Sequence, residues 1–198
     1  MVTSGDRPAD LPGRIVAALD RLARAQRAHR QTVAERHSLT PLQLDLLRVV
    51  ADGAPPEPVV GQLARELAVS QPTVTDAVHT LARKGLLARR RDPADARRRV
   101  VELAPRGAAL ATELQQVDGP LRDAVAALDP TAQEDTLRSL LGLIAGFVDA
   151  GVITVARTCL TCRFHKELVP GRHHCTLLAM DLARGDLRVD CPEHVGVG

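Results

Sequence analysis

Four cysteines near the C-terminal end are the residues of this sequence whose spacing most clearly indicates chemistry. They follow the pattern Cys159-x2-Cys162-x12-Cys175-x15-Cys191, and a proline follows the last one. A Cys-x2-Cys pair is the spacing with which a chain holds one metal ion or one corner of an iron-sulfur cluster. In a reducing compartment such a group favours metal ligation over disulfides. We therefore expect a metal or cluster site that uses all four cysteines as ligands.

The spacing of the last two cysteines bears on which cofactor binds. Most four-cysteine zinc sites use two Cys-x2-Cys pairs, whereas Cys175 and Cys191 each stand alone, which favours iron-sulfur. The pattern over residues 159–191 also resembles that of high-potential iron-sulfur proteins, with Phe164 shortly after the second cysteine and Leu177-Leu178 after the third. This resemblance implies a [4Fe-4S] cluster ahead of a [2Fe-2S] cluster, and zinc remains the alternative.

Four histidines accompany the cysteines: His165, His173, His174 and His194. We expect them to donate hydrogen bonds near the ligands rather than to bind the metal themselves. In a mixed zinc site, His173 or His174 could replace one cysteine.

A second group of functional candidates is basic. The segment from Arg83 to Arg99 holds eight Lys and Arg residues against Asp92 and Asp95, although the net charge of the whole chain is only +2. A local excess of positive charge beside a neutral remainder indicates a polyanionic partner. The alternative is an ordinary solvated charged surface. The position of these residues in the fold decides between the two interpretations.

The sequence predicts that these basic residues lie on a helix-turn-helix and on a hairpin that follows it. Val60 to Leu67 predicts one short helix, and Ser70 can cap a second helix that accepts Pro72 in its first turn and reaches Gly85. Residues 86–91 and 99–103 predict two strands joined by a turn at residues 92–95. The arginines therefore fall on a wing beside the second helix.

Periodic apolar residues predict helices on both sides of this head. The composition is 45% hydrophobic with no Trp or Tyr, so we expect a core of Leu, Val and Ala. Residues 54–58 (APPEP) predict a linker that cannot continue a helix. The expected flanking helices cover about residues 11–36, 41–52, 106–117, 121–128 and 131–156.

Three stretches of the sequence together resemble the MarR family of winged helix-turn-helix regulators. They are LTPLQLDLLRVV (39–50), LARELAVSQPTVTDAVHTLARKGLLARR (63–90) and DPADARRRVVELAPRG (92–107). The resemblance covers about residues 10–156 and implies a homodimer that reads a pseudo-palindromic site on double-stranded DNA. It implies that Asp95 and Arg97 form the wing-tip Asp-x-Arg. Our predicted DNA-binding residues are Ser70, Gln71, Thr73, Thr75, His79, Arg83, Arg91, Asp95, Arg97 and Arg98.

The predicted fold is mainly α with a small β-wing: a winged helix-turn-helix head, a helical dimerisation domain and a small cysteine-ligated C-terminal module. The expected domains are an N-terminal dimerisation helix (1–38), the DNA-binding domain (39–107), C-terminal dimerisation helices (108–156) and the cysteine-rich module (157–198).

The predicted function is a cytoplasmic DNA-binding regulator whose operator affinity depends on an iron-sulfur cluster. No stretch of about 18 apolar residues and no signal peptide are present, so we expect no membrane partner. One alternative is a regulator with a structural zinc and a small-molecule effector bound between the dimer and head domains. A redox enzyme or electron carrier is a remote alternative, because the chain lacks GxGxxG, GxxxxGK[ST], HExxH and GxSxG motifs. We therefore expect a protein that is not an enzyme.

Overall fold

The computed structural model describes residues 10–53, 58–92, 95 and 97–197. Residues 54–57 of the predicted linker and residues 93–94 of the predicted turn lie outside the described residues. Contacts within the chain divide it into two units, Met1–Leu44 and Asp45–Gly198, which are treated separately. In the first unit, helix α1 (Leu11–Arg36) has the bounds that the sequence predicts, and the Asp10 carboxylate accepts a hydrogen bond from Gly13 N at 3.0 Å. Helix α2 (Pro41–Asp52) begins in this unit and ends in the second.

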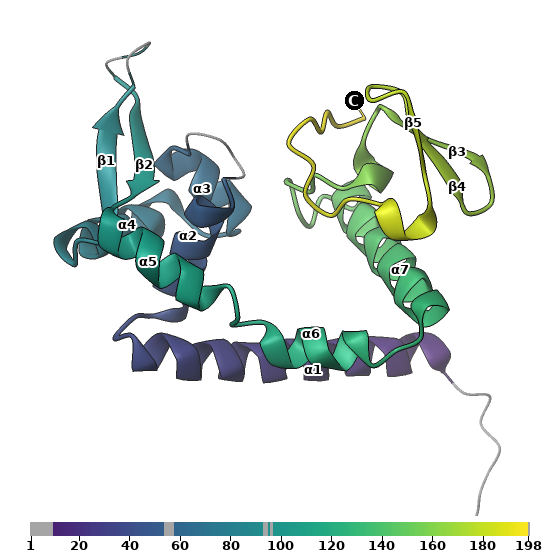
Figure 1. Cartoon of the computed structure of the whole chain (residues 1–198), viewed down its shortest axis with the longest axis horizontal. Coiled ribbons are helices and arrows are strands. Elements are labelled where there is room, and N and C mark those ends of the chain that lie inside the picture. The colour runs from purple at the N-terminus through teal and green to yellow at the C-terminus, as the bar shows by residue number, and fades with distance from the viewer. Residues whose placement is uncertain (1–9, 54–57, 93–94, 96, 198) are drawn as a thin grey trace, which may run out of the picture. The chain divides into compact units, whose positions relative to one another are not determined.

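The second unit contains the predicted head. It comprises helices α3 (Val60–Glu66) and α4 (Gln71–Arg83), strands β1 (Leu87–Arg91) and β2 (Arg99–Leu103), and helix α5 (Pro105–Leu114) (Figure 1). The head is built around completely buried aliphatic side chains, which include Leu63, Val74, Val78 and Leu81. The predicted helix-turn-helix, and a core of Leu, Val and Ala, are therefore confirmed.

Two glycines shape the connection between helix α4 and the wing. Gly85 has φ +69°, a left-handed conformation that ends the helix without the strain a side chain would add. Gly107 lies in α5 where a Cβ atom would come within 1.8 Å of the Leu86 carbonyl oxygen, so only glycine allows this close approach. Strands β1 and β2 then pair antiparallel from Leu87 opposite Leu103 to Arg91 opposite Arg99, which confirms the predicted wing.

The helices predicted over residues 106–117 and 131–156 are shorter in the structure, whereas the helix predicted over 121–128 keeps its length and begins two residues earlier. Helix α5 ends at Leu114 rather than near residue 117, and α6 spans Gly119–Ala126. Helix α7 (Pro130–Asp149) ends seven residues before the predicted limit, because Gly151 adopts φ +68° and turns the chain away from the helix axis. None of the described helices is long and apolar enough to cross a membrane.

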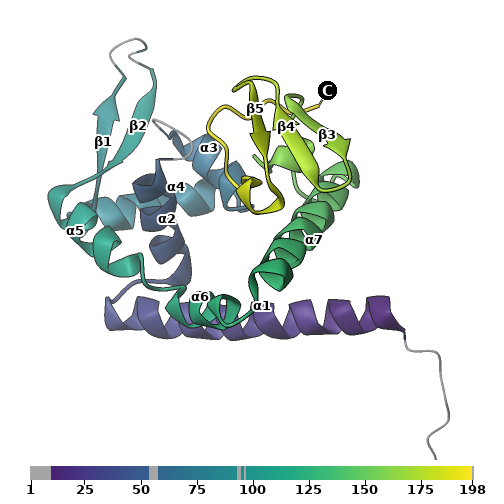
Figure 2. The same ribbon diagram turned by 45° about the vertical axis from the view of Figure 1, so that its right-hand side comes forward.

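The cysteine-rich segment folds into a small module along α7 (Figure 2). Strands β3 (His165–Val169), β4 (Arg172–Cys175) and β5 (Met180–Leu182) form an antiparallel sheet in the order β3-β4-β5, flanked by the short 3-10 helices η1 (Cys159–Thr161) and η2 (Arg184–Asp186). Its buried cluster consists of Leu141 from α7 with Cys159, Leu182 and Leu187. The sequence predicted a ligand-held module but not these strands.

Candidate nucleic-acid interface and cysteine site

Helix α4 presents a polar N-terminal end on an apolar base. The Ser70 hydroxyl caps the helix by accepting a hydrogen bond from Thr73 N at 3.3 Å, and its oxygen lies 2.7 Å from the Thr73 hydroxyl. Ser70, Gln71 and Thr73 are exposed, whereas Val74 is completely buried one residue later. The first turn of α4 can therefore meet a ligand without disturbing the core.

Two further predicted contact residues are already engaged within the protein. The Thr75 hydroxyl donates to the Gln71 carbonyl at 2.9 Å, so it offers its methyl group and an acceptor lone pair outward. His79 Nε2 lies 2.7 Å from a guanidinium nitrogen of Arg89 on strand β1. This contact ties the wing to α4, and it gives Arg89 a role that the sequence analysis did not assign.

The wing holds its arginines in two different ways. Arg91 and Arg97 are exposed, whereas Arg98 donates to the carboxylate of Asp92 at 2.7 Å. Asp92 is only 6% exposed, so this pair is partly withdrawn from solvent. The sequence gives no reason to distinguish Arg91, Arg97 and Arg98, whereas the structure shows that Arg98 is partly structural.

Asp95 acts on the backbone of the wing. Its carboxylate accepts a hydrogen bond from the Arg97 backbone N at 2.9 Å, and its carbonyl accepts one from Arg98 N at 2.9 Å. An Asp side chain bonded two residues ahead is an Asx-type turn, which fixes the direction in which Arg97 leaves the hairpin. The interaction reaches the backbone of Arg97.

The four cysteines are free and line one cavity of the C-terminal module together with His165, Leu178, Leu182 and Arg188. Burial raises the pKa of the Cys159 thiol, and the neighbouring thiolates of Cys191, Cys162 and Cys175 raise it further. The four side chains therefore share one electrostatic environment. No group of three or more His, Cys, Asp or Glu side chains among the described residues is arranged to hold a single metal ion.

Arg188 contacts two of these sulfurs, and no sequence pattern pointed to it. Its backbone N donates to Cys159 Sγ at 3.2 Å, and its guanidinium lies 3.7 Å from Cys191 Sγ and 3.3 Å from the Glu193 carboxylate. The bond to Cys191 raises the pKa of Arg188, so the side chain stays charged. N–H groups directed at cysteine sulfurs stabilise thiolates, the form that binds metal.

Of the four histidines, only His165 lines the cysteine cavity. Its Nε2 lies 3.1 Å from Nδ1 of His173, which is 1% exposed and whose Nε2 has no hydrogen-bond partner within the described part of the chain. Burial lowers the pKa of His165, and the charge of His173 lowers it further. His174 is paired with Asp181 at 2.8 Å, and His194 Nε2 lies 3.0 Å from the Thr161 hydroxyl.

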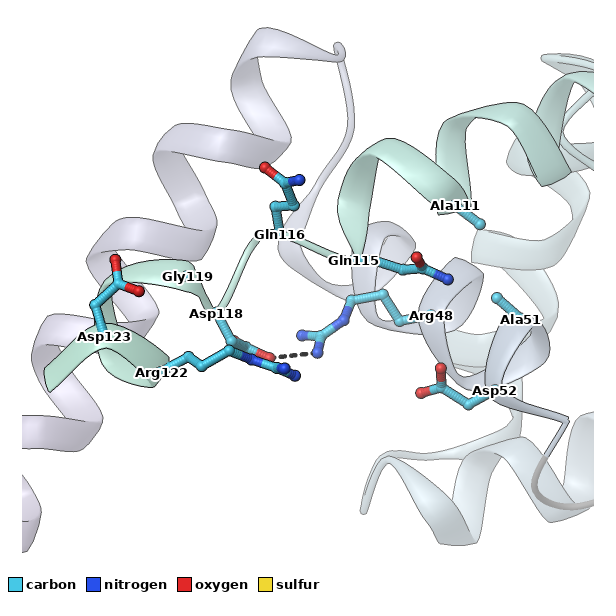
Figure 3. A pocket seen from close by; sticks show the side chains of 10 residues that line it. All are labelled: Arg48, Ala51, Asp52, Ala111, Gln115, Gln116, Asp118, Gly119, Arg122 and Asp123. Carbon is cyan, nitrogen blue, oxygen red and sulfur yellow. Dashed lines mark hydrogen bonds and ion pairs between the residues drawn. The ribbon is translucent and has the colours of Figure 1, made fainter. Parts of the chain in front are cut away.

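A separate polar cavity of about 730 Å³ lies where α2, α5 and α6 meet (Figure 3). Arg48 and Arg122 line it, and an ion pair joins the Arg48 guanidinium to the Asp118 carboxylate. Asp52 and Asp123 lie on its rim with Gln115 and Gln116. The cavity offers charge of both signs, so a ligand with one acidic group could pair with either arginine.

Comparison with known proteins supports the fold of the head. Residues 37–98 match the sequence model of the MarR family. MepR of S. aureus in its DNA-binding conformation is 19% identical, with a TM-score of 0.61 over 67% of this chain and 98% of MepR. The MepR-DNA complex gives 20% identity and a TM-score of 0.58, over 66% of this chain and 96% of that one.

A third similar structure is BldR, a transcriptional regulator from Sulfolobus solfataricus. It is 21% identical, with a TM-score of 0.56 over 70% of this chain and 98% of BldR. The chain thus spans nearly the whole of these proteins and has additional length that they do not match. Segment 37–98 matches the MarR family, and the described chain has the winged-helix fold of MarR-type transcription regulators.

Proposed function

We propose that this chain is a DNA-binding transcription regulator whose affinity for its operator depends on an iron-sulfur cluster held by Cys159, Cys162, Cys175 and Cys191. The observation that carries the DNA-binding part is the polar first turn of α4 beside a wing with exposed arginines. A capped helix of this kind suits contacts to base edges in the major groove, and arginines suit contacts to phosphates. The similar MepR structure was solved as a complex with DNA, which agrees with this proposal.

Exposed apolar side chains on two helices support the pairing of two copies. Helix α1 exposes Leu11, Ile15, Val16 and Leu22, and α7 exposes Leu140, Leu143 and Phe147. Apolar stripes of this extent on helices favour association. A homodimer would place two heads about one turn of DNA apart, about 34 Å, and so read a pseudo-palindromic site.

DNA binding is tested by selecting 30-base-pair duplexes (about three helical turns) from a random pool and measuring Kd by fluorescence anisotropy over a range of salt concentrations. We expect the selected sequences to contain two related half-sites. Gln71→Ala should relax the preference at one position of each half-site, because a side chain that reads a base edge confers selectivity there. Selection of no consensus, with an unchanged preference in the variant, contradicts sequence-specific binding by α4.

Two observations favour a cluster over a single zinc ion in the cysteine cavity. Cys175 and Cys191 each stand alone, whereas most four-cysteine zinc sites use two Cys-x2-Cys pairs. A cluster spreads its ligands over several iron atoms, and hydrogen bonds such as those from Arg188 to the sulfurs tune its reduction potential.

The cofactor is tested by purifying the chain without oxygen and measuring iron, sulfide, zinc and the absorption spectrum. We expect a brown protein with absorption near about 400 nm from thiolate-to-iron transitions. The charge of the cluster, and whether the cluster stays bound, would depend on oxidants and on the iron supply. A colourless protein with one zinc per chain contradicts the cluster and leaves zinc as the cofactor.

The Arg48 cavity favours the second candidate, in which zinc is structural and a small acidic molecule is the signal. Its two arginines offer charge-assisted hydrogen bonds to a carboxylate. Benzoate is a suitable probe, and titration should weaken DNA binding if this cavity is the sensing site. Arg122→Gln should then abolish the response while leaving the cysteine site loaded. Benzoate without effect on the Kd for DNA contradicts this use of the cavity by aromatic acids.

A further inference from the structure

The segment between α7 and the first cysteine lies against the turn of the helix-turn-helix. A hollow of about 370 Å³ is bordered on one side by Val152, Ile153, Thr154 and Val155. On its other side lie residues of α3 and of the turn that leads to Ser70, the cap of α4. The C-terminal module therefore meets the head of its own chain at the element that positions α4.

One strong polar contact joins these two parts. The Arg157 guanidinium donates to both carboxylate oxygens of Glu66, at 2.7 and 2.9 Å, and to Asp190 at 3.1 Å. The side chains of Arg157 and Glu66 are only 17% and 18% exposed. A two-pronged guanidinium–carboxylate contact fixes orientation as well as distance, and partial burial reduces its screening by salt.

The same arginine belongs to the cysteine site through its backbone. The Arg157 carbonyl accepts a hydrogen bond from Cys191 N at 2.9 Å, and Asp190, its second partner, directly precedes Cys191. Arg157 also lies two residues before Cys159. A displacement of either cysteine therefore moves the backbone or a side-chain partner of Arg157.

On the head, the other end of the contact lies close to the start of α4. Glu66 is the last residue of α3, and Ser70 caps α4 four residues later. Between them Ala68 holds φ +52°, a left-handed conformation that is uncommon for a residue with a side chain. Because this connection is short and tightly turned, a displacement of Glu66 should also displace Ser70, which caps α4.

We infer that the Arg157–Glu66 ion pair carries the state of the cysteine site to the DNA-reading helix within one chain. This inference rests on the proposed function and adds a route to it. The cavity that the four cysteines line together with four other residues has a volume of about 20 Å³, so a cluster bound there would displace the cysteine side chains and, through them, the segments around Arg157.

The test compares DNA affinity of the full chain in two forms, reconstituted anaerobically with iron and sulfide, and stripped with a chelator. The probe is the duplex selected above, and the quantity is the ratio of the two Kd values. In the unaltered chain we expect a ratio of roughly 5 to 150, the usual range of coupling between sites. In Glu66→Gln the ratio should fall close to one, while the iron content per chain stays unchanged.

Glu102→Gln is the matched control. It removes one carboxylate from the head and breaks the Arg90–Glu102 ion pair. Both residues of this pair belong to the wing. Both substitutions remove one negative charge, so we expect both to raise the affinity for DNA in each form. Only the control should keep the full ratio between the Kd values of the two forms. If Glu66→Gln folds poorly, Arg157→Gln and the double variant replace it, and the three should show the same loss because they break one contact.

The outcomes separate the coupling contact from the proposed function. A Glu66→Gln variant that retains the full ratio overturns the inference and leaves the sensor intact. A ratio of one in the unaltered chain overturns the sensor itself, and the inference with it. A ratio lost equally in Glu102→Gln shows a general effect of charge and also overturns the inference.

Discussion

The head and the cysteine module reach stability by different means. The head buries aliphatic side chains from helices and strands, with Leu63, Val74 and Leu81 completely inaccessible to solvent. The module has a buried cluster of four residues, of which Leu141 is borrowed from α7 and Cys159 is a thiol. A short segment with so little apolar burial usually needs cross-links or a metal to fold. From this contrast we expect the head to be stable by itself, whereas the module should depend on the proposed cofactor.

Removal of one predicted ligand is the strongest test of this difference in stability between the head and the module. Cys175→Ser should abolish iron binding, since a cluster with three thiolates is poorly held. Trypsin should then cleave within residues 157–190, while the thermal melting of the head by circular dichroism stays unchanged. Thr176→Ala is the control, because it removes a hydrogen bond to the Phe164 carbonyl from the neighbouring position but no ligand. Full iron content in Cys175→Ser would show that Cys175 is not a ligand.

The converse substitution tests the head. Leu81→Ala removes a completely buried side chain and should lower the free energy of unfolding of the head by about 2–5 kcal/mol. Urea denaturation followed by circular dichroism measures this loss. Iron content should stay unchanged, because the cysteines do not depend on Leu81. Leu182→Ala, in the module core, should show the opposite pattern, and a loss of iron in both variants would mean that the two regions fold as one unit.

A smaller effect distinguishes two arginines within the wing. Arg97→Ala should reduce the slope of log affinity against log salt by about one, the value expected for one phosphate contact. Arg98→Ala should reduce the slope less and destabilise the wing, because it removes the ion pair with the buried carboxylate of Asp92. Arg184→Gln, which breaks an exposed pair with Asp135 beside α7, serves as a control without effect on the slope. Equal slopes for the two wing variants would contradict the structural role of Arg98.

The smallest expected effect is a pH dependence at the turn between β3 and β4. The hydrogen bond from Gly171 N lowers the pKa of Glu167 below its ordinary value of 4.5. A carboxyl whose pKa is depressed by folding stabilises the fold above its unfolded value, and this contribution is lost as pH falls through the folded pKa. The amide signal of Gly171 in a pH titration by NMR should therefore shift with a midpoint below 4.5.

Glu167→Gln keeps an acceptor for the Gly171 amide but cannot titrate. The signal should then stay flat across the same pH range. A midpoint at or above 4.5 in the unaltered chain would contradict the role of the Gly171 bond.

Local patterns predicted the head well because each of its elements has a signal of its own. Ser70 with Pro72 marks the start of α4, Gly85 marks its end, and the turn residues between two basic strands mark the wing. The strands of the module lacked such a signal. They are short, and His, Lys and Arg interrupt the alternation of apolar and polar residues that identifies a strand.

Contacts between segments that are distant in the chain could not be predicted from the sequence. Glu66 and Arg157 are ordinary charged residues in their own neighbourhoods, and only the tertiary structure brings them together. The same holds for Arg188, whose bonds to Cys159 and Cys191 depend on how the chain closes around the cavity. Sequence spacing identified the four cysteines, but their second-layer partners follow from the fold.

The Arg157–Glu66 contact also has a consequence in the opposite direction. Coupling between two binding sites is reciprocal, so a factor by which the cluster changes operator affinity is the factor by which the operator changes cluster affinity. If the proposed coupling holds, a chain bound to its operator and a chain free in solution would bind their clusters with different affinity. Each regulated promoter would then set, by its own occupancy, the sensitivity of the regulator bound to it.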